Sequence, residues 1–385
     1  MYEMEQIDER VILVGIDTGN EDAANRSLDE LSELAKTAKA AVVGRLIQPR
    51  ESAHPGTYIG KGKLTELKDL IWETDATGII CDDELTSAQL GNLEEELSCK
   101  IIDRTLLILD IFAARAVSGE GKIQVELAQL RYRASRLAGL GRSLSRLGGG
   151  IGTRGPGEKK LEMDRRLIRE RISRLKKELK DVEKHRELIR TQRKQSGLKV
   201  AALVGYTSAG KSSIENVLTN AGILEDAMLF STLDTTTRSL VLDNTQEILV
   251  TDTVGFIRKL PHHLVEAFKS TLEEAKYADI IIHVVDASNP QMDEQMHVVY
   301  DTLRQLGAAD RPVITLFNKQ DARTDSEPLH DFRADYTLNI SAAKDLGLDE
   351  VKSLLEEILR ENKVYIERII PYDKAGVIQL IRKQG

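Results

Sequence analysis

Two glycines, a lysine and a serine stand at a spacing that suits phosphate binding. Residues 205–212 read G-Y-T-S-A-G-K-S, which has the form G-x-x-x-x-G-K-[ST]. An apolar run at 200–204 precedes them, and residues 213–218 can continue as a helix. Glycines let backbone N–H groups turn toward phosphate oxygens, and the helix N-terminus adds positive potential. We expect phosphate contacts from Gly205, Tyr206, Thr207, Ser208, Ala209, Gly210, Lys211, Ser212 and Ser213.

A second stretch supplies a carboxylate and a glycine. An apolar strand is expected at 248–251, and it ends at Asp252-Thr253-Val254-Gly255. D-x-x-G is frequent by chance, but behind a phosphate loop and a strand it places a carboxylate near Mg²⁺ and a glycine N–H near the γ-phosphate. Lys211 is expected to reach the β- and γ-phosphates, and the Ser212 hydroxyl to bind Mg²⁺ with Asp252. Lys211 and Gly255 are therefore candidate catalytic residues.

A third stretch indicates which base is bound. The apolar strand at 312–317 ends in N-K-Q-D, and the strand at 336–340 is followed by S-A-A-K. An aspartate can accept hydrogen bonds from both N1–H and N2–H₂ of guanine, and adenine lacks that donor pair. The sequence therefore predicts GTP and GDP as ligands. The base contacts are expected from Asn318, Lys319 and Asp321, and from the backbone of Ser341, Ala342 and Ala343.

The residue after the D-x-x-G stretch limits the chemistry. Many GTPases place a glutamine there to orient the attacking water, and this chain has Phe256. A phenyl ring can neither donate nor accept the required hydrogen bonds. We expect slow hydrolysis by the chain alone and stimulation by a partner.

Charge is distributed unevenly along the 385 residues. The net charge is −8, yet residues 115–200 hold 24 lysines and arginines against 10 aspartates and glutamates. A basic segment in an acidic chain suggests one element that faces a polyanion. The sequence has no apolar run long enough to cross a bilayer and no signal peptide, so we expect a cytoplasmic protein. The cysteines, Cys81 and Cys99, are expected to be buried thiols.

The fold class predicted is α/β. Strands and helices alternate through residues 1–115, which indicates a parallel α/β domain without a second phosphate loop. Helical spacing at 122–139 and 158–193 predicts a long antiparallel hairpin in a basic region at 116–196. The GTPase domain, with a mostly parallel sheet, is expected at 197–362.

The connection between the two hairpin helices is unusual in composition. Residues 140–157 are rich in glycine and contain no acidic residue. A loop that only reverses two helices needs a handful of residues, and a long cationic tip suits insertion into folded RNA. Arg142, Arg146 and Arg154 are the candidate RNA-binding residues.

Three stretches resemble one family. The tip motif G-G-G-I-G-T-R-G-P-G-E, the D-T-V-G-F-I stretch and the earlier Y-I-G-K-G turn are similar to those of the HflX family of translation-factor-related GTPases, over nearly the whole chain. The resemblance implies that the protein binds the 50S ribosomal subunit and its rRNA, and hydrolyses GTP. It also implies that the protein splits or rescues stalled ribosomes under stress, with the hairpin tip near the peptidyl-transferase region. We expect a monomer.

The resemblance also carries residue roles. It favours Thr237 as a third Mg²⁺ ligand and catalytic residue, with Thr236 a close second. The family usually has Asn at the position of Ser208, where related GTPases use it to hold an activating K⁺, so K⁺ activation is left open. Residues 363–385 correspond to the start of a C-terminal domain that longer relatives carry. The alternative function is a GTP-dependent switch that binds a non-ribosomal protein or RNA partner.

Overall fold

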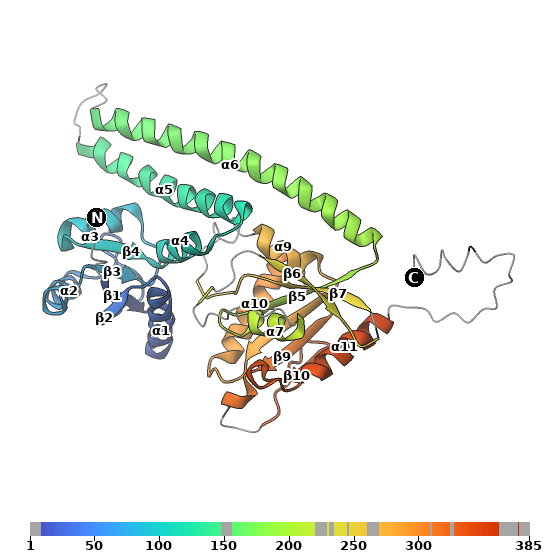
Figure 1. Cartoon of the computed structure of the whole chain (residues 1–385). Coiled ribbons are helices and arrows are strands. Elements are labelled where there is room, and N and C mark those ends of the chain that lie inside the picture. The colour runs from blue at the N-terminus through green and yellow to red at the C-terminus, as the bar shows by residue number, and fades with distance from the viewer. Residues whose placement is uncertain are drawn as a thin grey trace, which may run out of the picture. The chain divides into compact units, whose positions relative to one another are not determined.

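The structure is a computed structural model of the chain. It describes residues 9–147, 156–219, 229–230, 235–244, 246–259, 269–308, 310–323, 327–361 and 376. Contacts between residues divide the chain into two compact units, one formed by 1–179 with 259–267 and the other by 180–258 with 268–385. Each unit is built around its own sheet (Figure 1).

The first unit contains a four-stranded parallel sheet in the order β2-β1-β3-β4. Its inner strands are continuous apolar runs, as expected where helices cover both faces. The prediction of an N-terminal parallel α/β domain is confirmed. The strands are β1 (Arg10–Asp17), β2 (Ala41–Pro49), β3 (Gly78–Cys81) and β4 (Lys100–Asp103), and the helices between and after them are α1 (Glu21–Thr37), α2 (Lys61–Thr74), α3 (Ser87–Leu97) and α4 (Arg104–Arg115).

Helix starts in this unit follow local sequence signals. The Asn20 side chain accepts a hydrogen bond from the N–H of Ala23 and caps α1. Thr86 and Gln89 form a capping box at α3. Asp103 caps α4 by accepting from the N–H of Leu106 at 2.9 Å. These side chains satisfy N–H groups that the first helical turn leaves without partners.

Asp103 also anchors helix α5 (Gly119–Leu147). The Tyr132 hydroxyl donates to Asp103 Oδ1 at 2.8 Å, and the Arg136 guanidinium pairs with Oδ2. Asp103 is 1% exposed, so this carboxylate is buried with its partners. The first hairpin helix is thereby fixed to the end of strand β4.

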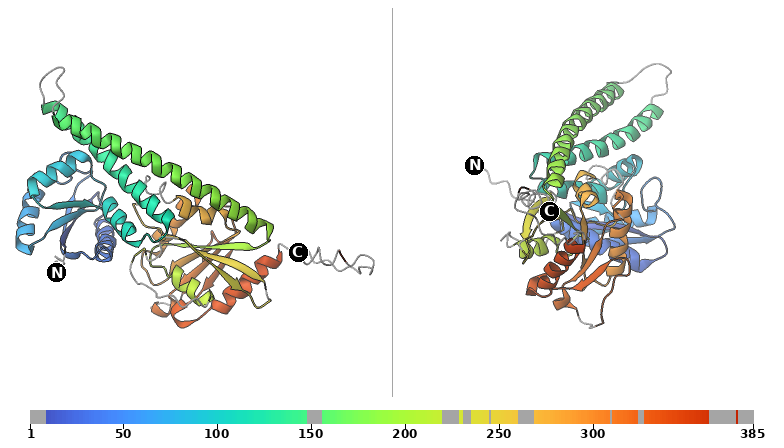
Figure 2. Two further views of the ribbon diagram at one scale, coloured as in Figure 1. Left: turned by 45° about the horizontal axis from the view of Figure 1, so that its top comes forward. Right: turned by 90° about the vertical axis from the view of Figure 1, so that its right-hand side faces the viewer.

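The hairpin is formed by α5 and the first half of the 40-residue helix α6 (Pro156–Gln195). These segments run side by side in Figure 1 and in the left view of Figure 2. Arg171 of α6 forms two hydrogen bonds with the Glu126 carboxylate of α5, at 2.7 and 2.8 Å. The predicted hairpin is confirmed, and α6 would span about 60 Å at 1.5 Å per residue.

The predicted loop at 140–157 requires a correction, because α5 continues to Leu147 and α6 begins at Pro156. Leu140, Leu144 and Leu147 continue the helical spacing, and proline is favoured in the first helical turn. Isolated glycines at 139 and 141 lower helix propensity without forbidding a helix.

The second unit contains a six-stranded sheet in the order β10-β9-β8-β5-β7-β6. All neighbouring strands are parallel except β6 and β7, which are antiparallel. The predicted mostly parallel sheet is confirmed. The strands are β5 (Lys199–Gly205), β6 (Thr236–Val241), β7 (Glu247–Asp252), β8 (Ile280–Asp286), β9 (Val313–Asn318) and β10 (Tyr336–Asn339).

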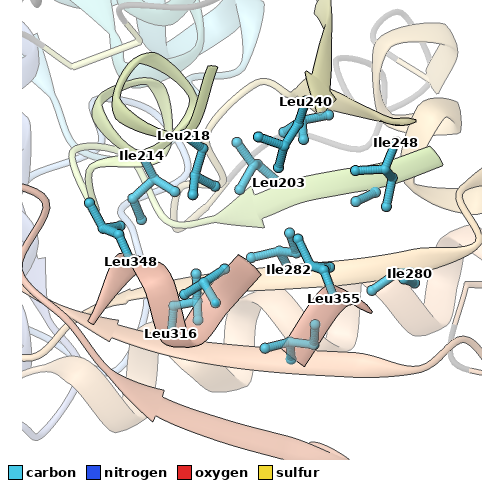
Figure 3. Packing of buried hydrophobic residues seen from close by; sticks show 14 of the residues in the cluster. Leu203, Ile214, Leu218, Leu240, Ile248, Ile280, Ile282, Leu316, Leu348 and Leu355 are labelled. Atoms are coloured by element: carbon cyan, nitrogen blue, oxygen red, sulfur yellow. The ribbon is translucent and has the colours of Figure 1, made fainter. Parts of the chain in front are cut away.

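Helices cover both faces of this sheet. Helices α7 (Lys211–Thr219) and α11 (Leu348–Glu361) lie on one face, and α9 (Lys269–Tyr277) and α10 (Met292–Leu306) lie on the other (Figure 2). The core on the first face contains Ile214, Leu218, Leu348 and Leu355 from the helices, packed against Leu203, Ile282 and Leu316 of the sheet (Figure 3). Among the described residues, no helix is long and apolar enough to span a membrane.

Candidate nucleotide-binding site

The loop 206–210 connects β5 with α7 and so has the strand–loop–helix setting that the motif requires. Gly210 has a φ of +95°, and a Cβ there would lie 2.3 Å from Nδ2 of Asn318. Only glycine fits this conformation and this space. Asn318 Nδ2 in turn donates to the carbonyl of Ala209 at 2.9 Å. The fold therefore brings N-K-x-D against the phosphate loop.

Lys211 is buried at the first position of α7. Its Nζ donates to the carbonyls of Gly205 and Tyr206, at 3.2 and 2.9 Å. Burial lowers the pKa of Lys211 to about 8, and the charge of Asp252 offsets this only in part. Phosphate oxygens beside such a group would stabilise its charged form. The electrostatics of Lys211 thus favour an anion.

Ser212 and Asp252 meet at the carboxyl end of the sheet. The Ser212 hydroxyl donates to Asp252 Oδ2 at 2.7 Å, and Asp252 is 1% exposed. A hydroxyl and a carboxylate are ligands that Mg²⁺ accepts, with phosphate and water oxygens completing the shell. In the described part of the chain, no three His, Cys, Asp or Glu side chains form a metal site by themselves. The residues therefore fit a magnesium ion bound together with a nucleotide.

The two candidate threonines point to opposite faces of the sheet. Thr236 pairs with Asp252 across the antiparallel ladder, and Thr237 pairs with Thr251. Directly paired residues share a face and successive residues alternate. The Thr237 hydroxyl lies 3.0 Å from that of Thr251, so it faces away from Asp252. This arrangement favours Thr236 over Thr237 as the Mg²⁺ ligand. Thr236 pairs with Asp252 and therefore lies on the face of the sheet where Ser212 and Asp252 meet.

Glu215 is a residue of this site that sequence reasoning missed. It is 2% exposed on α7, and its carboxylate accepts a hydrogen bond from Thr236 at 2.8 Å. Burial raises the pKa of Glu215 to about 7, against the opposing effects of Thr236 and Arg238. The sequence held one indication of this role. Glu215 stands three positions after Ser212 in the run I-E-N-V-L, where a helix that packs on a sheet needs apolar side chains.

The base-recognition residues are gathered at the ends of β9 and β10. Asn318 Oδ1 accepts from the N–H of Ala342 at 3.0 Å. The Ser341 hydroxyl donates to Asp321 Oδ1 at 2.5 Å, and this hydrogen bond lowers the pKa of Asp321. Lys319 Nζ pairs with Asp286 at 2.7 Å, a partner at the end of β8 that the sequence did not indicate. Ala342 and Ala343 lie in a short 3₁₀ turn, η2 (Ala342–Lys344).

Gly255 lies against the phosphate loop. A Cβ on Gly255 would be 2.9 Å from the Cα of Thr207 and 3.1 Å from Nζ of Lys211. Phe256 is buried at 3% exposure and pairs with Tyr206 in an isolated parallel bridge. The D-x-x-G segment therefore reaches the lysine that the sequence assigned to the phosphates.

The predicted RNA-binding arginines are described only in part. Arg142 and Arg146 lie in the last turns of α5, and Arg154 lies outside the described residues. The basic character of the hairpin continues on α6, where Arg169, Arg174, Lys176 and Lys177 are exposed.

Since N-K-x-D stands beside a phosphate loop that carries a buried lysine and a serine–aspartate pair, the second unit defines a P-loop GTPase. Three family models match consecutive parts of the chain. A "GTP-binding GTPase N-terminal" model matches residues 25–113, a "GTP-binding GTPase Middle Region" model matches 115–193, and a "50S ribosome-binding GTPase" model matches 200–319. The chain belongs to the HflX family of GTPases.

Relatives named GTPase HflX match the chain over all or nearly all of its length. GTPase HflX of Lacrimispora saccharolytica is 65% identical over 385 residues, covering 100% of this chain and 91% of the relative. GTPase HflX of Caldanaerobacter subterraneus is 51% identical, covering 100% and 89%. GTPase HflX of Escherichia coli is 40% identical, covering 93% and 85%.

A solved structure shares the fold. The crystal structure of SsGBP in complex with GDP matches with a TM-score of 0.52 at 24% identity, covering 92% of this chain and 100% of that one. At this identity the match describes the fold alone.

Proposed function

We propose that this GTPase binds the 50S ribosomal subunit and uses hydrolysis of GTP to GDP and phosphate to split or rescue stalled ribosomes under stress. The observation that carries the proposal is the pairing of a guanine-nucleotide site with a basic hairpin in one chain. The family model that matches the second unit is described as a 50S ribosome-binding GTPase, which supports the same partner. In this role the protein is a cytoplasmic monomer.

The hairpin has the chemistry of an RNA-facing arm. Arg169, Arg174, Lys176 and Lys177 are exposed on α6. Arg171 of α6 pairs with Glu126 of α5, and α5 is fixed to the α/β sheet through the buried Asp103 pair with Arg136. A fixed helix presents cations in a constant geometry, and phosphate contacts supply most of the affinity for nucleic acid.

Each motif of the nucleotide site has its own expected role in binding GTP. Lys211 would bind the β- and γ-phosphates, the Gly255 N–H would face the γ-phosphate, and Asp321 would select guanine. Ser212, Asp252 and Thr236 would hold Mg²⁺, which neutralises charge on the phosphates when bound. K⁺ activation through Ser208 stays open.

Ribosome stimulation follows from Phe256. Its buried ring cannot orient water, so this position of the chain does not supply that catalytic group. A ribosomal group, or a segment that orders on the ribosome, would supply it. The ribosome thereby controls when GTP is hydrolysed.

Co-sedimentation with 50S particles tests the proposal. The protein is mixed with 50S in GDP or in a non-hydrolysable GTP analogue, and turnover is measured with and without 50S. We expect stronger binding with the analogue and faster turnover with 50S. Equal, weak binding in both nucleotides would refute the ribosomal role. Binding to another partner that resists ribonuclease would favour a protein-binding switch instead.

A further inference from the structure

Helix α7 carries two polar side chains on the face that meets the sheet. Ser212 and Glu215 stand three residues apart, a spacing that places them on the same face of a helix. Ser212 lies in the first turn, next to the phosphate loop, and its hydroxyl donates to Asp252. Glu215 is 2% exposed and lies about 4.5 Å farther along the helix. Glu215 is therefore buried behind the expected magnesium position, on the side away from the nucleotide.

The site thus contains two pairs of a hydroxyl with a carboxylate. The first is Ser212 with Asp252, at 2.7 Å. In the second, the Thr236 hydroxyl donates to Glu215 Oε2 at 2.8 Å. Thr236 stands directly opposite Asp252 in the β6–β7 ladder, so both pairs lie on one face of the sheet. A hydroxyl has one proton and two lone pairs. Because the Thr236 proton points to Glu215, away from the nucleotide, the lone pairs are turned toward the magnesium position.

The Glu215 carboxylate is itself held by strand β6. Arg238 Nε lies 3.5 Å from Oε2, the oxygen that also accepts from Thr236. Thr236 and Arg238 are two residues apart on β6, so their side chains share a face. A helix that packs on a sheet needs apolar side chains at such a position, and burying a carboxylate is costly. An apolar residue would serve a structural role alone, so the carboxylate at 215 points to a role in the site.

We propose that Glu215 is a positioning residue whose carboxylate accepts the Thr236 hydrogen bond and so holds the Thr236 oxygen toward a nucleotide-bound Mg²⁺. Glu215 acts through Thr236 and is not a ligand itself. The inference rests on the guanine-nucleotide function of this site and does not involve the ribosome. Side chains that bind metals are oriented by such outer partners, and loss of the partner typically lowers metal affinity about ten- to a hundredfold.

The test measures how a non-hydrolysable GTP analogue is retained as free Mg²⁺ is varied, at pH 8 and without ribosomes. The quantity compared is the Mg²⁺ concentration that gives half of the full slowing of analogue dissociation. Glu215→Met removes both acceptor oxygens and keeps the length of the side chain, so this concentration should rise about tenfold or more. Glu215→Gln keeps one acceptor oxygen and should raise it less. Thr315→Val is the matched control, because Thr315 also donates to a buried carboxylate, Asp331, at 2.7 Å, and it should leave the Mg²⁺ requirement unchanged.

A double-mutant cycle separates positioning from a merely structural role or a general effect of charge. Thr236→Val removes the hydroxyl and keeps the shape of the side chain. If Glu215 acts through this hydroxyl, Glu215→Met should have no further effect in the Thr236→Val background. An equal loss in both backgrounds, an unchanged Mg²⁺ requirement, or a lower requirement in Glu215→Met would overturn the proposal.

Circular dichroism checks that each variant folds. If Glu215→Met does not fold, Glu215→Gln takes its place in the cycle, and its smaller loss should likewise disappear in the Thr236→Val background. GDP binding in EDTA is measured in the same series and should match the parent in every variant. Loss of the guanine site itself would therefore be recognised separately from loss of the Thr236 contact.

Discussion

Asn318 spans two parts of the nucleotide site: its Nδ2 donates to the carbonyl of Ala209, and its Oδ1 accepts from the N–H of Ala342, at 2.9 and 3.0 Å. One amide side chain, 2% exposed, therefore joins the phosphate loop to the segment expected at guanine O6. The amide sets the spacing between the phosphate and base subsites.

Asn318→Ala should weaken GDP and GTP together. The substitution leaves a buried carbonyl and a buried N–H without partners, at about 1–3 kcal/mol each, so we expect at least about a tenfold loss. Titration calorimetry with both nucleotides measures it. Asn92→Ala, in the first unit, is the control. Unchanged affinity would mean that the two subsites are held together by other contacts.

Asp321→Asn should change which base is accepted. The Ser341 hydroxyl orients the Asp321 carboxylate, which would accept from two guanine donors. An amide replaces one acceptor with a donor, so GTP should bind about 1–3 kcal/mol more weakly. Xanthosine triphosphate should bind more tightly than it does to the parent. Competition between the two nucleotides checks the exchange, and retained preference for GTP would contradict it.

Lys211→Ala and Ser212→Ala should each reduce turnover by about a hundredfold or more, because each removes a group expected at the transferring phosphate. Single-turnover hydrolysis measures this loss. Lys199→Ala serves as the control, since Lys199 lies outside the site and pairs with Asp279. Turnover within a few-fold of the parent in both variants would rule out this site.

Acidification should destabilise the second unit through His283. The ring is 1% exposed on β8, and burial lowers its pKa to about 4. The unfolded chain takes up a proton near the ordinary pKa of 6.5, whereas the folded chain does not until about pH 4. Stability present above pH 6.5 is therefore lost as the pH falls toward 4, by about 2–3 kcal/mol. Urea unfolding at pH 6.5 and 4.5 tests this, and His283→Leu should lose that part of the dependence. An equal pH slope in the variant would assign the effect to other groups.

Replacing Arg142, Arg146 and Arg154 with alanine should weaken 50S binding and flatten its dependence on salt, because each phosphate contact releases counterions. Intrinsic turnover without ribosomes should not change. A triple variant of Lys36, Lys39 and Arg45, exposed residues of the first unit, controls for net charge. Identical binding by variant and parent at every salt concentration would mean that the tip only connects the two helices and does not bind RNA.

The motifs were predictable because their chemistry depends on residues adjacent in sequence. A phosphate loop after an apolar run, or N-K-x-D after another, needs no long-range information. The partners of these motifs were not predictable in this way. Asp286 reaches Lys319 only because β8 lies beside β9. Strand β8 itself, Ile280–Asp286, was not assigned from the sequence, although apolar residues lie on both sides of His283.

Register decided the remaining differences. Nothing local shows that Thr236 pairs with Asp252, and that register determines which threonine lies on the same face as Asp252. Glu215 is similar, since an acidic residue on a short helix is normally solvent-exposed. It is buried here because Thr236 and Arg238 lie across from it on the same side of β6.

The buried Asp103 has a consequence for where the chain can be cut. A fragment ending at residue 115 would keep the whole four-stranded sheet but lose Tyr132 and Arg136, which bind this carboxylate. Removing the partners of a buried charge costs about 3–5 kcal/mol, a large share of the stability of a small domain. The α/β sheet and helix α5 should therefore melt in a single cooperative transition, and a soluble fragment for biophysical work should include both.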